Sequence, residues 1–268
     1  MKFIVLAVIS IILCFVINKW LGIAALACAV IYAVYTLIPS IYANRGNVEF
    51  SQGNDEEALK WYKKAVDTKH ANVIIRASYA FLLLKTGHPE DAETVLNLIL
   101  MSKNLPVNKR NIAKQHRCMV YYKLGRLDEA IEEAEELFEN YKNSAVYGML
   151  GYFKILNDDD LNETLNFCLE AYDFNNDDRD ILDNLSIVYY KLGQYDKAKE
   201  ISDKLIETAP KFIEAFYHGA QIREKCGDTD GALELLENIG DCQRSYLTTV
   251  SEEEIESLKK ILQNSKNI

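Results

Sequence analysis

The stretch VYYKLGRLDEA, Val120 to Ala130, decides the fold, because the chain repeats it almost unchanged as VYYKLGQYDKA, Val188 to Ala198. The two copies lie 68 residues apart, which is twice 34. Self-similarity at a fixed period of roughly 20–50 residues is typical of solenoids and other repeat arrays. A unit of 34 residues accommodates two short helices and their turns. The duplication therefore predicts an array of helical hairpins.

The same phase extends over most of the chain. Small residues recur in register, 34 or 38 positions apart, at Ala58, Ala92, Ala130, Thr164, Ala198 and Ala232. Five residues before these positions stand Gly53, Gly87, Gly125, Asp159, Gly193 and Gly227. A small residue lets two helices pack closely, and glycine ends a helix by adopting positive φ. We therefore predict six helix pairs, with Asp128 and Asp196 capping the second helices of two of them.

This pattern resembles the tetratricopeptide repeat family, over residues 39–246. The fifth unit matches the family pattern best, with Leu185, Tyr189, Gly193, Ala198 and Pro210. The resemblance implies an all-α, right-handed solenoid of about six helix pairs. It also implies that the first helices line a concave face, which holds a peptide or helix of a partner protein.

The first 38 residues are of a different kind. Phe3–Ile17 and Leu21–Ile38 contain no charged residue. As helices they would be about 22 and 27 Å long at 1.5 Å per residue, against a hydrocarbon core of about 30 Å. We predict a membrane anchor, residues 1–38, in which two transmembrane helices form a hairpin around Lys19. A cleaved signal peptide is the alternative, since it also begins with a basic residue and an apolar run.

The basic residues near the apolar segments indicate which side the repeats occupy. Two spans would place Lys2 and Arg45 together, opposite Lys19, and the positive-inside rule then favours repeats that face the cytoplasm from the cell membrane. The six cysteines include no CxxC pair, which also suits a reducing compartment. If only one segment spans the membrane, the orientation could be the reverse.

Charge and motifs exclude several classes of function. The formal net charge is −10, which argues against nucleic acid as a partner. No GxxxxGK[ST], GxGxxG or HExxH motif occurs. The run Asp173–Asn184 begins like a calcium loop, but Asp178 and Asn184 replace the required glycine and glutamate. We therefore predict Asp-rich turns rather than a metal site, and no enzyme, no cofactor and no small-molecule substrate.

The candidate contact surface follows from helical spacing. Positions 2, 5, 9 and 12 of each first helix share one side. Its apolar candidates for binding a partner are Phe81, Leu84, Met119, Tyr122, Tyr152, Ile155, Ile187 and Tyr190. A contiguous exposed apolar patch is typical of a binding site. The alternative is that part of this stripe packs inside a tight superhelix or against the C-terminal helix.

The chain ends with a predicted capping helix in residues 247–268. Ser251 and Glu254 form a capping box, and Ile255, Leu258 and Leu262 share one face. A solenoid needs such an element to close its last repeat. A tail helix that binds a partner is the alternative.

These observations together predict a bacterial, membrane-anchored scaffold that recruits an unidentified protein or peptide in the groove of its repeats. Two alternatives remain. One is an extracytoplasmic repeat protein in envelope assembly or secretion. The other is an accessory subunit of a membrane enzyme or transport complex, which it would contact through the hairpin.

Overall fold

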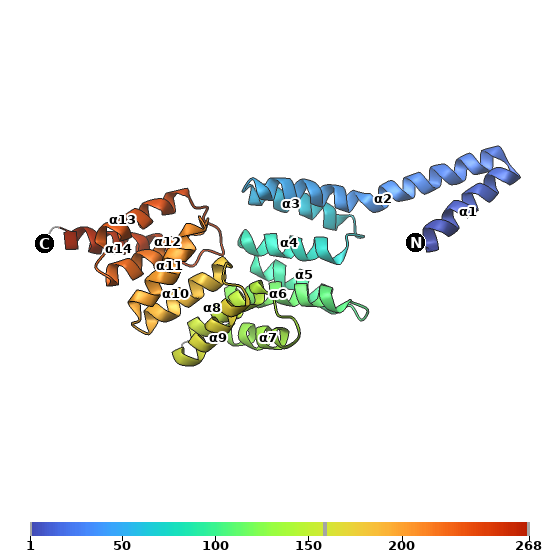
Figure 1. Ribbon diagram of the computed structural model, residues 1–268. Helices are drawn as coiled ribbons and strands as arrows, with labels where there is room; N and C mark the ends of the chain where they lie inside the picture. The colour runs from blue at the N-terminus through green and yellow to red at the C-terminus, as the bar shows by residue number, and fades with distance from the viewer. Residues whose placement is uncertain (1, 158–159, 267–268) are drawn as a thin grey trace. The chain divides into compact units, whose positions relative to one another are not determined.

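The computed structural model describes residues 2–157 and 160–266. Within these ranges every regular element is a helix, fourteen α-helices and one 3₁₀ helix (Figure 1), so the prediction of an all-α helical-repeat solenoid is confirmed. The chain divides into two compact units, Met1–Tyr79 and Ala80–Ile268.

The first unit contains α1 (Lys2–Ile17), α2 (Lys19–Ser51), α3 (Asp55–Asp67) and the start of α4 (Val73–Lys85). The second contains α5 (Pro89–Leu100), α6 (Val107–Lys123), α7 (Leu127–Asn140), α8 (Ser144–Asn157), α9 (Leu161–Phe174), α10 (Arg179–Lys191), α11 (Tyr195–Glu207), α12 (Ile213–Lys225), α13 (Thr229–Asn238), η1 (Ile239–Asp241) and α14 (Glu252–Lys266).

In the first unit the apolar segment and the first repeat share one helix. The side chain of Asn18 caps α2 by accepting from the amide of Trp20 at 2.8 Å. The helix then continues through Pro39 to Ser51 without a break. Past Pro39, α2 packs on α3, where the ring of Tyr62 lies against Gly46. One continuous helix therefore joins the apolar segment directly to the first repeat.

Among the described helices, α2 alone is long and apolar enough to cross a membrane, with a hydropathy of 2.3 over its best window. The apolar stretch described in α1, Leu6–Ile17, is shorter. The structure thus offers one candidate span of this kind, and the second span of the hairpin stays a prediction.

The turns between the helices of each pair confirm the predicted role of the regularly spaced glycines. Gly53, Gly87, Gly125, Gly193 and Gly227 all have positive φ, between 71° and 85°. After Gly125 the amide of Arg126 donates to the carbonyl of Tyr121 at 2.9 Å, and Gln194 donates in the same way to Tyr189 at 2.9 Å. These are the closing bonds of Schellman motifs, which require the left-handed residue between them.

The small residues in phase are buried as predicted. Ala58, Ala92, Ala130, Ala198 and Ala232 have 0% exposed surface, and Thr164 has 4%. In the third repeat Ala130 belongs to a core with Cys118 and Phe153, which come from α6 and α8. In this repeat the crossing position therefore joins one helix pair to the next.

The second helices begin differently from the prediction. Arg126 and Gln194 occupy the N-cap positions of α7 and α11, and neither side chain makes a capping hydrogen bond. Asp128 and Asp196 lie in the first turn instead, where a negative charge favours the helix dipole. In the fourth repeat, whose Asp159 lies outside the described residues, Asp160 is the cap of α9 and accepts from the amide of Asn162 at 2.8 Å.

The last helix, α14, carries the expected capping box. The amide of Ser251 donates to Glu254 at 2.8 Å, and the amide of Glu254 donates to the Ser251 hydroxyl at 3.2 Å. Ile255, Leu258 and Leu262 are buried in one cluster with residues of α12 and α13. The end of the second unit is thereby closed.

Candidate functional site

The eight predicted contact residues divide into buried and partly exposed side chains. Leu84 and Ile155 have 1% and 3% exposed surface. Leu84 is therefore a core residue, and its assignment to an open contact surface is wrong. The partly exposed residues are Phe81, Met119, Tyr122, Tyr152, Ile187 and Tyr190.

Two of these tyrosines form a fixed pair between the third and fourth repeats. The hydroxyl groups of Tyr122 and Tyr152 lie 3.0 Å apart, and their rings meet edge to face at 5.6 Å. The ring of Tyr122 also lies 5.5 Å from that of Phe153, which is fully buried. Burial and the bond to Tyr122 raise the pKa of Tyr152. The pair thus contributes to packing between helices, besides any contact with a ligand.

The segment Cys242–Val250, which we call the inner loop, returns from the sixth repeat across this face. The amide of Tyr246 donates to the carbonyl of Lys85 at the end of α4, at 3.2 Å. The ammonium group of Lys123, in α6, lies 5.4 Å from the centre of the Tyr246 ring. The inner loop therefore contacts the second and third repeats and covers part of the face assigned to a partner. The covering segment is this loop, which precedes the C-terminal helix against which the alternative placed the stripe.

The C-terminal half of the inner loop is firmly attached. The amide and hydroxyl of Thr249 both donate to Glu214 of α12, at 2.6 and 3.1 Å. Arg244 donates to the carbonyl of Val250 at 2.6 Å and pairs with Glu252 at 2.7 Å. The side chain of Val250 is buried in the core beneath α14. These bonds hold the C-terminal half of the inner loop against α12 and α14.

A pocket of about 400 Å³ lies beside the inner loop, and we call it the loop-side pocket. It is lined by four of the predicted residues, Tyr152, Ile155, Ile187 and Tyr190, together with Thr249 and Val250 of the inner loop. Its volume is in the range of ligand pockets, and apolar walls with a few polar groups are typical of such sites. Among the predicted residues, Phe81, Met119 and Tyr122 do not line it.

His218, which lines the loop-side pocket, is paired with a carboxylate behind it. The Nδ1 atom of His218, on α12, lies 3.0 and 3.2 Å from the two carboxylate oxygens of Asp183, on α10. Burial opposes the charge of the imidazole, but the attraction and hydrogen bond of Asp183, helped by Glu214 and Glu254, outweigh it and raise the pKa of His218. The amide and hydroxyl of Ser251 lower the pKa of Glu254, and His218 adds to this effect.

His116 has the opposite environment. Its ring lies 5.5 Å from the ring of Phe81, and burial lowers its pKa to about 4. No carboxylate is among the causes of this shift, so the imidazole is held neutral by its surroundings. His116 is therefore a packing residue.

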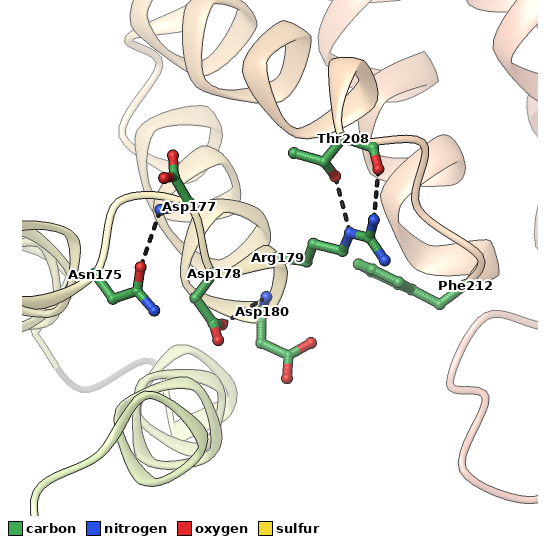
Figure 2. Close-up of a pocket in the computed structure, with 7 residues that line it drawn as sticks. All are labelled: Asn175, Asp177, Asp178, Arg179, Asp180, Thr208 and Phe212. Carbon is green, nitrogen blue, oxygen red and sulfur yellow. Dashed lines mark hydrogen bonds between the residues drawn. The ribbon is translucent and has the colours of Figure 1, made fainter.

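The Asp-rich turn before α10 forms a second hollow, of about 530 Å³ (Figure 2). Asp178 caps α10 by accepting from the amide of Asp180 at 3.1 Å, and Asn175 accepts from the amide of Asp177 at 3.2 Å. The carboxylate of Asp177 points away from those of Asp178 and Asp180 in Figure 2. In the part of the chain that the structure describes, no group of three or more His, Cys, Asp or Glu side chains could hold a metal ion. The turn is thus a capping structure.

Comparisons with known proteins agree with the repeat phase. Models described as TPR repeat and as tetratricopeptide repeat match residues 46–87 and 180–212, which supports this family. No curated protein matches the sequence.

Solved structures show the same fold. A tetratricopeptide repeat protein from Parabacteroides merdae ATCC 43184 is 17% identical, with a TM-score of 0.65 over 93% of this chain and 94% of its own. The pilF protein of Pseudomonas aeruginosa is 16% identical, with a TM-score of 0.59 over 85% of this chain and 99% of its own. The likeness extends over most of each chain and establishes a helical-repeat solenoid of the tetratricopeptide type.

Proposed function

We propose that this chain is a membrane-anchored scaffold, without enzymatic activity, that recruits a partner protein to the cytoplasmic face of the cell membrane. Its repeats bind a segment of the partner on the face that contains the loop-side pocket. The apolar N-terminal helices fix its location. The observation that carries the proposal is that four of the predicted contact residues, on α8 and α10, converge on one open pocket.

The exposed surface of α2 supports the anchor. Large apolar side chains, among them Leu26, Val30, Ile31 and Val34, are exposed along the whole apolar part of this helix. A patch of this extent is unfavourable in water and favourable in hydrocarbon. Because α2 continues into the first repeat without interruption, the anchor and the repeat helix move as one body.

Partner capture from living cells tests the binding surface. The full-length chain, fused to a proximity-labelling enzyme, is compared with a variant carrying Ile187→Ala and Tyr190→Ala, which lie one turn apart on α10. A matched control carries Leu98→Ala and Met101→Ala, two apolar residues that are exposed and do not line the pocket. We expect the α10 variant to lose the labelled partners identified by mass spectrometry, and the control to keep them. Equal labelling by both folded variants would contradict the proposed surface.

Two further experiments test the anchor and its orientation. We expect the chain to stay in the membrane fraction after extraction with alkaline carbonate, and its release would contradict an integral anchor. Cys118 is a poor reporter of orientation because it is buried and burial raises its thiol pKa. In a Leu98→Cys variant, the exposed thiol should react with an impermeant maleimide only after lysis. Labelling of intact cells would place the repeats on the outer side.

A further inference from the structure

The turn between α3 and α4, residues 68–72, lies beside the apolar part of α2. The carbonyl of Tyr35 on α2 lacks its usual helical partner four residues later, because Pro39 has no amide hydrogen. The Nε2 atom of His70, in the turn, lies 2.7 Å from this carbonyl oxygen and donates to it. The rings of Tyr35 and His70 also stack, with their centres 4.1 Å apart. These contacts hold the turn close to the end of the apolar run Leu21–Ile38.

The packing of α3 on α2 gives the first unit a direction. α3 lies alongside the second half of α2 and runs antiparallel to it (Figure 1). Tyr62, within α3, donates from its hydroxyl to Asn47 of α2 at 2.6 Å. His70, after α3, reaches Tyr35, which lies earlier on α2. The C-terminal end of α3 therefore points toward the apolar run, and at 1.5 Å per residue its first turn lies about 15 Å farther away.

Charge changes sign along this direction. The first turn of α3, far from the apolar run, is acidic and contains Asp55, Glu56 and Glu57. Nearer the apolar run, residues 61–79 contain one acidic residue, Asp67, and four basic residues, which we call the basic edge: Lys63, Lys64, Lys69 and Arg76. Four positive charges against one negative charge leave an excess of three in this segment. The remaining acidic residue of the unit, Glu49, pairs with Arg45 at 2.9 Å.

The charges of the basic edge are not neutralised by carboxylates of the chain. Lys63 and Lys69 are exposed, and Lys69 has a φ of 65° in the turn. The ammonium group of Lys64 lies 4.0 Å from the centre of the Trp61 ring, and Arg76 donates to the carbonyl of Lys69 at 3.4 Å. Among the residues that the structure describes, none of the four basic side chains forms an ion pair. Their positive charge is therefore available to an external anion.

In a membrane crossed by α2, the basic edge lies at the depth of the lipid headgroups. The apolar run is about 27 Å long against a hydrocarbon core of about 30 Å, so its end lies at the interface. Tyr32 and Tyr35 are 69% and 51% exposed near this end, and exposed aromatic residues are enriched at membrane interfaces. Because His70 is bonded to Tyr35, the turn lies at the same depth. Anionic headgroups attract lysine and arginine at this level.

From this arrangement we propose that the basic edge binds anionic phospholipid headgroups of the leaflet in which the apolar run of α2 ends. The lysines contact the headgroup phosphates, and the bond between His70 and Tyr35 keeps them at that depth. The first repeat is thereby held to the membrane surface by lipid as well as by α2. This inference names the lipid class that the anchor selects and rests on the proposed function.

Native mass spectrometry of the full-length chain tests the lipid preference. The protein in neutral detergent micelles is mixed with equal concentrations of phosphatidylglycerol and phosphatidylcholine that have the same acyl chains, so that only the headgroup differs. A lysine near an anionic surface strengthens binding about fivefold. We expect chains that carry phosphatidylglycerol to be at least about fivefold more abundant than chains that carry phosphatidylcholine. Equal abundance of the two would overturn the inference.

Two matched double variants locate the site. Lys63→Gln with Lys69→Gln removes two exposed charges of the basic edge, whereas Lys211→Gln with Lys260→Gln removes two exposed charges of the second unit. We expect the first variant to lower the ratio of bound phosphatidylglycerol to phosphatidylcholine at least about threefold, with unchanged helicity. The second variant should keep the ratio of the unmodified chain. Equal ratios in the two variants would mean that the lipid binds elsewhere, and the inference would fail.

An acidic segment of a partner protein is the other occupant that a basic surface could bind. The proximity-labelling experiment distinguishes it from lipid. If the Lys63→Gln, Lys69→Gln chain loses labelled partners and keeps its lipid ratio, the basic edge binds protein and the inference is wrong. If that chain keeps its partners and loses the lipid preference, the inference holds.

The lipid experiment and the carbonate extraction fail independently. If the chain stays in the membrane fraction but binds both lipids equally, the anchor of the proposed function stands and the inference fails. If carbonate releases the chain but the basic edge still selects phosphatidylglycerol, the edge binds lipid at the surface and the integral anchor is wrong.

Discussion

Replacing Gly193 by alanine tests the physical basis of the repeat phase. Gly193 has a φ of 71° in the turn between α10 and α11. No atom lies within 4 Å of the position that an added Cβ would occupy, so the substitution causes no steric clash. The cost arises from the backbone alone, because the left-handed conformation is unfavourable for an L-residue by about 1–2 kcal/mol. A smaller gain from the stiffer unfolded chain offsets part of this. We expect a net loss of about 1 kcal/mol in the free energy of unfolding.

Gly240 provides a matched control. It lies in η1, has no atom within 4 Å of its would-be Cβ, and does not have positive φ. Gly240→Ala should therefore be neutral or stabilising by up to about 0.5 kcal/mol. Both variants are compared by urea unfolding of the full-length chain, followed by circular dichroism, with the midpoint as the readout and an unchanged slope as the check on cooperativity.

A triple variant enlarges the effect. Gly125, Gly193 and Gly227 have similar φ values, and none has an atom within 4 Å of an added Cβ. They lie in different repeats, so their alanine substitutions should add to a loss of about 3 kcal/mol. The reasoning is refuted if Gly193→Ala shifts the midpoint no more than Gly240→Ala, since the left-handed turn would then not limit stability.

Three other changes probe ionisable residues that pack between repeats. Glu133→Gln should lower the free energy of unfolding in urea by about 2 kcal/mol, because the largely buried Arg117 loses its carboxylate partner. In the native chain Arg117 Nε lies 2.9 Å from Glu133 Oε2. A loss below about 0.5 kcal/mol would contradict this expectation. The folded state favours protonated His218, so the stabilisation by this residue is complete below about pH 6.5 and is lost as the pH rises through its raised folded pKa. His218→Gln should therefore flatten the plot of unfolding free energy against pH in that range. An unchanged plot would exclude the pair with Asp183. His116, with its pKa lowered to about 4, should have the opposite effect on stability, which falls as the pH drops from about 6.5 to 4. His116→Phe should remove this loss of stability. Thermal melts at several pH values check this.

The repeat phase could be predicted because it depends on local chemistry. A turn that needs positive φ selects glycine, and a helix crossing that needs close approach selects alanine. Gly193 and Ala198 satisfy both needs in adjacent elements, and the structure assigns them those roles. Neither requirement depends on the rest of the chain, so a single sequence displays it.

The caps and the groove could be predicted only in part. The sequence places Asp128 at the cap of the second helix, but the Schellman turn ends at Arg126, which takes the N-cap position two residues earlier. Leu84 falls on the same side of its helix as Phe81 by spacing, yet it is buried. Helical periodicity identifies a side of a helix, whereas the packing of neighbouring repeats determines how much of that side stays open.

The inner loop is the feature that repeat reasoning missed, and its sequence contains a signal that could have indicated it. Twelve residues, 239–250, separate the end of the last helix in phase, α13, from the capping box at Ser251. Helix connections in bundles commonly need about 2–8 residues, so this link is longer than closure of the array requires. It also contains Tyr246 and Val250, whose apolar groups need a surface to pack on. Because Val250 and Thr249 line the loop-side pocket, the proposed function assigns part of the selectivity for a partner to this segment, which lies outside the repeats. Chains that share these repeats but differ in this link should therefore differ in the partner segment they bind.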